Sequence, residues 1–146
     1  MLPHRAEAML RSSYLKPEIN MSSTFEVGTQ LVDLCRHGKN AQAIESLYAP
    51  NIVSIEATPT PNFPQRLEGI EAIKGKNEWW EKNHEVHRAE ARGPFPHGDR
   101  FVVYFNYDVT AKDGPMKAQR MQIDEAALYT VKNGKIAQEE FFYHMG

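Results

Sequence analysis

The order of the periodic patterns along this chain constrains its fold more than any single motif. Up to residue 84 the apolar residues recur mainly at helical spacing, with one alternating stretch at 51–57 and a proline-rich loop at 58–65. After that point only strand-like segments follow. Helices followed by successive strands predict an α+β domain, whose twisted antiparallel sheet wraps its apolar face around the helices.

Three helices are expected in the first part of the chain. The first is expected to begin at a capping box made by Ser23 and Glu26, and to end at Gly38. The other two are expected over residues 40–48 and 69–84, where apolar residues again recur on one face.

The third helix carries two tryptophans in succession. Neighbouring helical residues point about 100° apart, so only one of Trp79 and Trp80 is expected to face the cone. The stripe through Ile73 and Asn77 selects Trp80 and continues to His84. Core packing of Trp80 is the plainer interpretation, and it is compatible with lining a pocket.

The chain of 146 residues is long enough for one domain with a real core and too short for two of ordinary size. Residues 1–20 contain two prolines, mixed charge and no sustained period. We therefore expect a loosely held extension that precedes a single domain over residues 21–146.

Four strands are predicted after the helices. Within the second of them, Phe105 and its alternating neighbours form the better inner face. The bulky Val102 and Tyr104 then lie on the outer face, which suits contact with a second subunit, so a homodimer is expected. The four strands are expected at residues 85–93, 100–110, 119–131 and 135–144.

The Asn133-Gly134 dipeptide is the strongest turn signal in the chain, because both residues accept the backbone of a type I′ hairpin turn. A two-residue turn fixes which residues of the last two strands face each other. The expected pairs are Lys132 with Lys135 and Leu128 with Glu139.

Two adjacent glutamates, Glu139 and Glu140, lie among aromatic residues of the last strand. Successive residues of a strand point to opposite faces, so only one of them faces inward. A single β-bulge would reverse the assignment, and periodicity alone leaves the choice open.

The segments "LYAPNIVSIEA", "EGIEAIKG" and "VKNGKIAQEEFFY", in this order after a helical hairpin, resemble the SnoaL-like branch of the nuclear transport factor 2-like superfamily over residues 23–144. The resemblance implies a cone: a curved antiparallel sheet wrapped around three helices, with a deep pocket between them. Related ketosteroid isomerases, epoxide hydrolases and polyketide cyclases use that pocket for acid–base chemistry, and other members have no known activity.

In the resembling proteins a bulge after the final turn directs alternate residues of the last strand into the pocket. Applied to this chain, the resemblance implies that Glu139, Phe141 and Tyr143 point inward and that Glu140 lies nearer the outer face. Glu125, on the neighbouring strand, is expected beside Glu139.

The ketosteroid isomerases carry their general base on the strand after the helical hairpin, and the matching residue is Glu56. Burial in an apolar cone would raise its pKa towards the range for proton abstraction at neutral pH. The alternative is a strand-end carboxylate that faces solvent or caps the proline-rich loop. Leu31 and either Ala126 or Ala127 replace the isomerases' tyrosine and acid, so steroid isomerisation is not expected.

A cyclase-type reaction needs one acid–base residue in a shaped apolar pocket, and the resemblance aims His87 into that pocket. A metal site on His84 and His87 is the alternative, but their spacing is not diagnostic, and neither a metal nor another cofactor is expected. The candidate catalytic residues are Glu56, His87, Glu125 and Glu139, and the candidate substrate-binding residues are Trp80, His84, Phe105, Tyr129, Phe141 and Tyr143.

The formal net charge of -2, without a basic run, argues against nucleic acid or a membrane as the partner. The lone Cys35 cannot form an internal disulfide, and no signal-like or membrane-spanning stretch occurs, so a cytoplasmic protein is expected. Two functions remain: an acid–base enzyme of isomerase, cyclase or hydratase type acting on a small hydrophobic molecule, or a non-catalytic dimerising scaffold.

Overall fold

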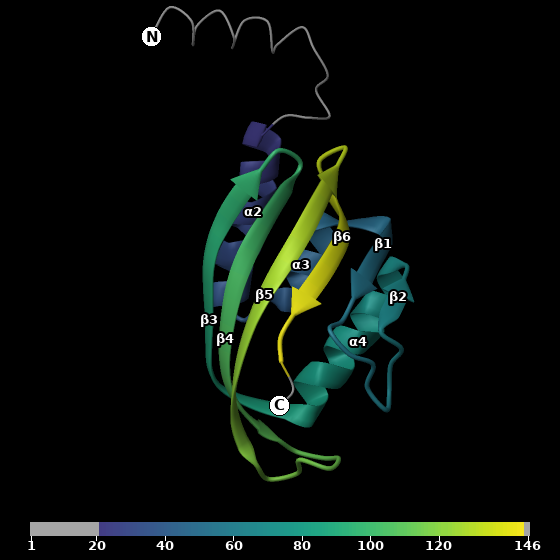
Figure 1. The fold of residues 1–146 in the computed structure, drawn as a ribbon, viewed down its shortest axis with the longest axis vertical. Coiled ribbons are helices and arrows are strands. Elements are labelled where there is room, and N and C mark those ends of the chain that lie inside the picture. The colour runs from purple at the N-terminus through teal and green to yellow at the C-terminus, as the bar shows by residue number, and fades with distance from the viewer. Residues whose placement is uncertain (1–20, 145–146) are drawn as a thin grey trace, which may run out of the picture.

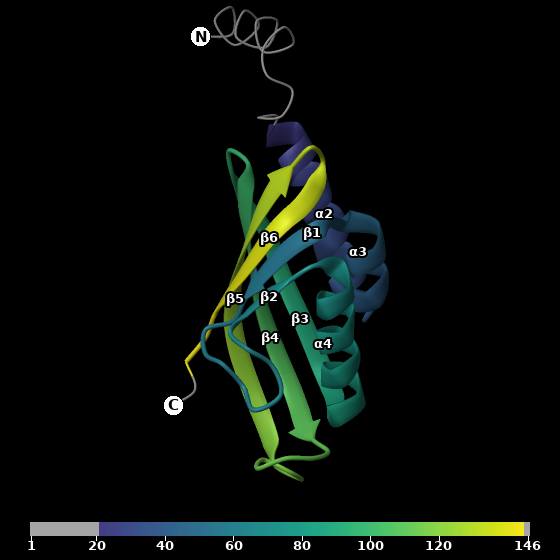
Figure 2. The ribbon, with the colours of Figure 1, turned by 90° about the vertical axis from the view of Figure 1, so that its right-hand side faces the viewer.

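The protein is described by a computed structural model over residues 21–144, and the expected N-terminal extension lies outside these residues (Figure 1). Seen from the side, the helices cover one face of a curved sheet (Figure 2), which confirms the predicted α+β cone. The helices are α2 (Met21–Arg36), α3 (Asn40–Leu47) and α4 (Ile70–Asn83). The strands are β1 (Tyr48–Ile55), β2 (Arg66–Glu68), β3 (His84–His97), β4 (Arg100–Ala111), β5 (Arg120–Lys132) and β6 (Lys135–Phe142).

The six strands form one sheet in the order β2-β1-β6-β5-β4-β3. Neighbours pair antiparallel except β1 and β6, which are parallel, so the sheet is mixed where a purely antiparallel one was expected. The parallel pair is possible because a long connection containing α4 separates β1 from the later strands. Strand β2 is only three residues long and gave no sequence signal.

Helix α2 differs from the sequence prediction at its start and agrees with it at its end. Residues 21 and 22 are already helical, so Ser23 lies inside the helix and cannot take the non-helical backbone of an N-cap. Gly38, at φ 69°, ends the helix as predicted. Its N–H donates to the Cys35 carbonyl, and the Lys39 N–H donates to the Leu34 carbonyl, which is the pattern of a Schellman motif.

The β5–β6 hairpin confirms both the predicted turn and the predicted bulge. Asn133 and Gly134 have φ values of 52° and 77°, as a type I′ turn requires, and Lys132 pairs with Lys135. The register then shifts by one residue, so Glu139 pairs with Tyr129 rather than with Leu128. This bulge turns Glu139 into the interior, where it is 3% exposed.

The core lies between the concave face of the sheet and the helices. Alternate residues of β4 and β5 point into it, as predicted, and the thiol of Cys35 lies in it as a small apolar group whose pKa burial raises to about 12. Buried members include Leu31, Val32, Ile44, Leu47, Ile73, Phe101, Val103, Phe105, Ala127, Tyr129 and Val131.

Helix α2 approaches β3 closely at a glycine. A Cβ added at Gly28 would lie 2.7 Å from the Cβ of Pro94, closer than real Cβ atoms come to one another. The absence of a side chain at Gly28 therefore sets the distance between α2 and β3, and so the width of this end of the cone.

Candidate functional site

Glu139 lies at the centre of the polar groups inside the cone. The Tyr48 hydroxyl donates a hydrogen bond to one of its carboxylate oxygens, and the Ser54 hydroxyl donates to the other at 2.7 Å. Both donors come from β1, and the parallel pairing of β1 with β6 places Ser54 directly opposite Glu139. Burial raises the pKa of Glu139, while the charge of Lys76 and these two hydrogen bonds act in the opposite direction.

Lys76, on α4, joins Glu139 indirectly to Glu56. Its Nζ donates to Ser54 Oγ at 2.8 Å and to Glu56 Oε1 at 2.7 Å. The second oxygen of Glu56 accepts a hydrogen bond from the Tyr143 hydroxyl at 3.0 Å. These contacts make a continuous interior network, which we define as Tyr48, Glu139, Ser54, Lys76, Glu56 and Tyr143.

The interior network has a fixed direction at its centre. An ammonium group can only donate hydrogen bonds, so Ser54 Oγ must accept from Lys76 and use its own hydrogen on Glu139. The side chains of Lys76 and Glu56 are 16% and 19% exposed, so this ion pair is largely shielded from water. Such a pair interacts more strongly than an exposed one and is held in one geometry.

Glu125, on β5, is the third carboxylate of the cone and differs from the other two. It is half-buried opposite Phe105 of β4, and among residues 21–144 its carboxyl group has no hydrogen-bond partner. Burial, followed by the negative charges of Glu56 and Glu139, raises its pKa to about 8, and Lys76 opposes this effect. At neutral pH this carboxyl group is therefore mostly protonated and available to exchange a proton.

Aromatic rings adjoin Glu125 and extend away from it. Phe105 stacks on Tyr107 with their centroids 5.8 Å apart, and Tyr107 lies 5.5 Å from Trp80. Trp80 in turn stacks on His84 at 4.5 Å, and the His84 ring hydrogen-bonds the Trp80 carbonyl through Nδ1. The structure thus brings Trp80, His84 and Phe105 together as one aromatic wall, as the sequence indicated.

The remaining candidate binding residues divide between core and site. Tyr129 is 2% exposed and stacks on Phe101, so it belongs to the packed core, where it lies beside Glu139 as its cross-strand partner. Phe141 is half-buried, and the Lys76 Nζ lies 5.4 Å from the centre of its ring. Together with Tyr143, Phe141 lies on the inward face of the last strand and the residues that follow it.

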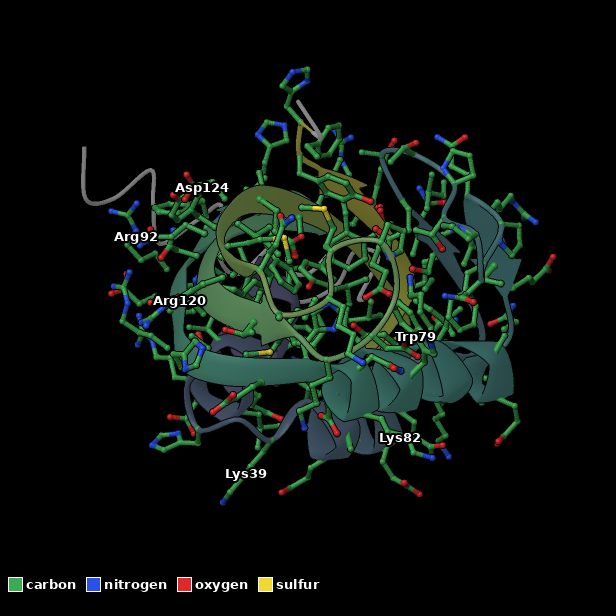
Figure 3. The ribbon with its side chains drawn as sticks, turned by 90° about the horizontal axis from the view of Figure 1, so that it is seen from below. Lys39, Trp79, Lys82, Arg92, Arg120 and Asp124 are labelled. Carbon is green, nitrogen blue, oxygen red and sulfur yellow. The ribbon has the colours of Figure 1, made fainter. Side chains whose placement is uncertain are left out.

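Trp79 shares the His84 ring with Trp80, at a centroid distance of 5.9 Å, but its other partner differs. Its ring meets Phe63 of the proline-rich loop edge to face, with centroids 5.6 Å apart. In Figure 3 Trp79 lies on the sheet side of α4, and Lys82 points away from the sheet. Both tryptophans are half-buried, and it is Trp80, the one expected to face the cone, whose ring lies against Tyr107 of the sheet.

The prediction that His87 points into the cone is wrong. His87 is exposed, and its Nε2 lies 2.7 Å from Thr110 Oγ1. The β3–β4 register shifts between Val86 and Arg88, so His87 is the extra residue of a bulge and loses the alternation that would have turned it inward.

Three residues of the interior network were missed by the sequence reasoning. Tyr48 was assigned to the apolar side of a helix, and Ser54 and Lys76 were not weighed. A signal existed for Ser54, because it shares a face of the alternating stretch with Ile52 and Glu56. Lys76 follows Ile73 by one helical turn and so lies beside the apolar stripe of α4.

The outer face of the sheet carries exposed charges of both signs. Asp124 accepts hydrogen bonds from Tyr104 and Asn106, and the Arg92 guanidinium lies 4.5 Å from the centre of the Tyr104 ring. Arg120 binds the Asp108 carboxylate through two nitrogens, at 2.9 and 2.8 Å. Figure 3 shows Arg92, Arg120 and Asp124 on the outside of the curved sheet.

Three further observations concern pockets, metal ligands and membrane spans. A groove of about 500 Å³ between β1 and the β5–β6 turn is lined by none of the candidate residues, so the interior pocket stays a prediction. Within residues 21–144, no group of three histidine, cysteine or acidic side chains is arranged to hold a metal ion. In the same part of the chain no helix is long and apolar enough to cross a membrane.

A curved sheet closed over three helices, with carboxylates turned inward, defines a cone-shaped α+β domain of the ketosteroid isomerase-like class. The family model of the SnoaL-like domain matches residues 22–143. The chain therefore belongs to the SnoaL-like domain family, within the nuclear transport factor 2-like superfamily, and the resemblance noted in the sequence is confirmed.

Solved structures agree with this assignment. A Mesorhizobium loti protein, described as a proposed SnoaL-like polyketide cyclase with carbohydrate phosphatase given beside it, is 42% identical, with 81% of this chain and 97% of that chain covered and a TM-score of 0.75. A Jannaschia protein, described as a proposed SnoaL-like polyketide cyclase, shares the fold at 19% identity, with 88% of each chain covered and a TM-score of 0.65.

A more distant structure shares the fold alone. The Mycobacterium tuberculosis epoxide hydrolase of the LEH-like type is 9% identical, with 85% of this chain and 84% of that chain covered and a TM-score of 0.62. The comparison with curated proteins found no match.

Proposed function

We propose that this protein is an acid–base enzyme that binds a small, largely apolar molecule in its cone, and that Glu125 transfers the proton. One observation carries the proposal. Of the three carboxyl groups in the cone, those of Glu139 and Glu56 each accept two hydrogen bonds. The carboxyl group of Glu125 has no hydrogen-bond partner among residues 21–144. A carboxyl group that is desolvated and unbound can exchange its proton with a ligand.

The pKa of Glu125 suits this role. At about 8, it leaves roughly a tenth of the groups ionised at about pH 7 and half of them one unit higher. A base whose pKa lies near the working pH combines an adequate ionised fraction with a strong tendency to accept a proton. We therefore expect turnover to rise with pH and to level off above about pH 8.

Glu56, the base implied by the family match, receives a different role in this proposal. Each of its oxygens already accepts a hydrogen bond, one from Lys76 and one from Tyr143. Proton abstraction by Glu56 would first have to break one of these contacts. We assign Glu56 to holding Lys76 in place, and Glu125 to the proton transfer.

The relationship to the Mesorhizobium loti protein supports a small organic substrate. That protein is described as a proposed polyketide cyclase, with carbohydrate phosphatase given beside it, and it is 42% identical to this chain over 97% of its length. The aromatic wall beside Glu125 offers planar apolar surface to such a molecule.

The proposal is tested by proton exchange on simple probes. Cyclohexanone, cyclohexenone and acetophenone are incubated with the protein in D₂O, and the loss of protons next to the carbonyl is followed by NMR. The parent protein should accelerate exchange, and Glu125→Gln should lower the rate by about a hundredfold or more. Glu140→Gln is the matched control. Glu140 follows Glu139 on β6, is half-buried like Glu125, and lies outside the interior network.

If none of the ketones reacts, direct titration of the Glu125 carboxyl group still tests the proposal. Carbon-detected NMR should show the Glu125 carboxyl group titrating near pH 8 in the parent protein. A Glu125 carboxyl group that titrates as a solvated glutamate would overturn the enzyme proposal and leave the dimerising scaffold.

We also propose that the protein forms a homodimer through the outer face of β4 and β5. Val102 and Tyr104 are half-buried on this face, and Arg92 and Asp124 carry charges of opposite sign next to Tyr104. A surface with both signs can complement itself about a two-fold axis. Light scattering at micromolar concentration should give twice the monomer mass, and a monomeric mass would contradict the proposal.

A further inference from the structure

Lys76 brings a positive charge to the same interior as Glu125. It extends from α4 to Ser54 of β1 and to Glu56, which directly follows β1. Its charge opposes the rise in the pKa of Glu125. The geometry agrees, because the Lys76 Nζ overlies the ring of Phe141, and Phe141 pairs with Ala127, two residues from Glu125 on β5. The position of Lys76 raises the question of what it does besides pairing with Glu56.

The hydrogen-bond count of Lys76 leaves one donor unused. An ammonium group has three N–H donors. One is directed at Ser54 Oγ and another at Glu56 Oε1, and within residues 21–144 no acceptor receives the third. The Lys76 Nζ also overlies the face of Phe141, whose ring centre is 5.4 Å away.

The position of Lys76 is fixed before any ligand arrives. Ser54 is fully buried and is itself tied to Glu139, and Glu56 is tied to Tyr143. A donor held in this way, away from bulk water, stabilises a developing charge without having to reorganise.

Removal of a proton by Glu125 creates the need for such a donor. When Glu125 takes a proton from carbon next to a carbonyl, the electron pair of the broken C–H bond moves to the carbonyl oxygen, which becomes an enolate. The residues that the resemblance matches to the isomerases' donors are Leu31 and either Ala126 or Ala127, and their side chains are apolar. None of them can donate a hydrogen bond to that oxygen.

We propose that Lys76 is a catalytic residue. Its free N–H donates a hydrogen bond to the substrate oxygen and stabilises the negative charge that develops there while Glu125 holds the proton. This inference rests on the proposed function and adds to it a requirement for the substrate: an oxygen that becomes anionic during the reaction. Glu125 then returns the proton to the product, so that no oxidant, reductant or second reactant is consumed.

The test uses para-nitrophenol, whose phenolate form resembles an enolate and absorbs differently from the neutral phenol. The parent protein should bind the phenolate in preference to the phenol, so that the bound probe ionises at lower pH than the free probe. Lys76→Met should lower that preference by about tenfold or more, whereas Lys76→Arg, which keeps a charged donor, should retain most of it.

A second measurement tests the role of Lys76 in the parent protein, without any substitution. The ammonium nitrogen resonance of Lys76 in the isotope-labelled parent protein should shift when the probe binds, and Lys74, on the same helix and paired with glutamates outside the cone, should not respond. A parent protein that prefers the neutral phenol, or fails to bind the probe, would overturn the inference.

The two proposals fail separately. Glu125→Gln should keep the phenolate preference, because it leaves Lys76 and its partners unchanged. Loss of ketone exchange in Glu125→Gln together with full exchange in Lys76→Met would uphold the proton transfer and refute the role of Lys76. A Lys76-dependent preference for the phenolate, with ketone exchange unaffected by Glu125→Gln, would support the role of Lys76 and refute proton transfer by Glu125.

Discussion

Replacing Glu125 by glutamine should make the protein more stable at high pH. Burial raises the pKa of Glu125 from its ordinary value of 4.5 to about 8. Below about pH 4.5 the group is protonated in both the folded and the unfolded chain, so it does not affect stability. Between 4.5 and 8 the folded chain keeps the proton that the unfolded chain releases, and the free energy of unfolding falls as pH rises.

The size of the effect follows from the same two values. Each pH unit in this window is worth about 1.4 kcal/mol, so Glu125 should cost about 3 kcal/mol of stability at about pH 7 and about 5 kcal/mol above about pH 8. Glutamine has nearly the same shape and never ionises. It should therefore remove this cost while leaving the packing opposite Phe105 almost unchanged.

Urea unfolding of the parent, Glu125→Gln and Glu140→Gln proteins at about pH 5, 7 and 9 measures the difference. The parent and Glu125→Gln should be within about 1 kcal/mol of each other at the lowest pH and should diverge steadily above it. Glu140→Gln should follow the parent at every pH. A constant difference between the parent and Glu125→Gln would show that Glu125 ionises as freely in the folded chain as in the unfolded one, and would refute the reasoning.

Three further substitutions test other parts of the structure by thermal unfolding and by the ketone exchange assay. Ser54→Ala removes a hydrogen bond from the buried Glu139 carboxylate and should cost about 1–3 kcal/mol, and a smaller loss would mean that water replaces the hydroxyl. Gly28→Ala gains about 1 kcal/mol of helix propensity but forces a Cβ to 2.7 Å from that of Pro94, so it should destabilise the protein by about 1–3 kcal/mol, and a stabilised variant would contradict the close packing. His87→Ala changes an exposed residue and should alter stability by less than about 0.5 kcal/mol and leave exchange intact; a loss of exchange would place His87 in the site after all.

The elements of the fold could be predicted because their signals are local. Helix periodicity, the Gly38 stop and the Asn133-Gly134 turn each depend on a few neighbouring residues, and each appears in the structure close to its expected place. The inward direction of Glu139 needed one step more, the bulge supplied by the family resemblance, and the shifted register confirms it.

The errors arise where backbone irregularities or distant pairings decide the outcome. Nothing in the sequence around His87 distinguishes a bulged strand from a regular one, and one extra residue was enough to turn the imidazole outward. The parallel pairing of β1 with β6 joins segments about 85 residues apart, and alternation within either strand says nothing about it. Ser54 and Tyr48 were missed as partners of Glu139 for this reason.

The different environments of Glu139 and Glu125 show how one cone can give two glutamates opposite roles. Both are inward-facing and desolvated, and burial raises the pKa of each. Glu139 receives two hydroxyl donors because β1 lies next to β6, and those contacts fix it in place. Glu125 lies on β5, between β6 and β4, where its cross-strand neighbour on β4 is the apolar Phe105. The strand order thus gives hydrogen-bond donors to one carboxylate and leaves the other without a partner among residues 21–144, which is what the proposed proton transfer requires.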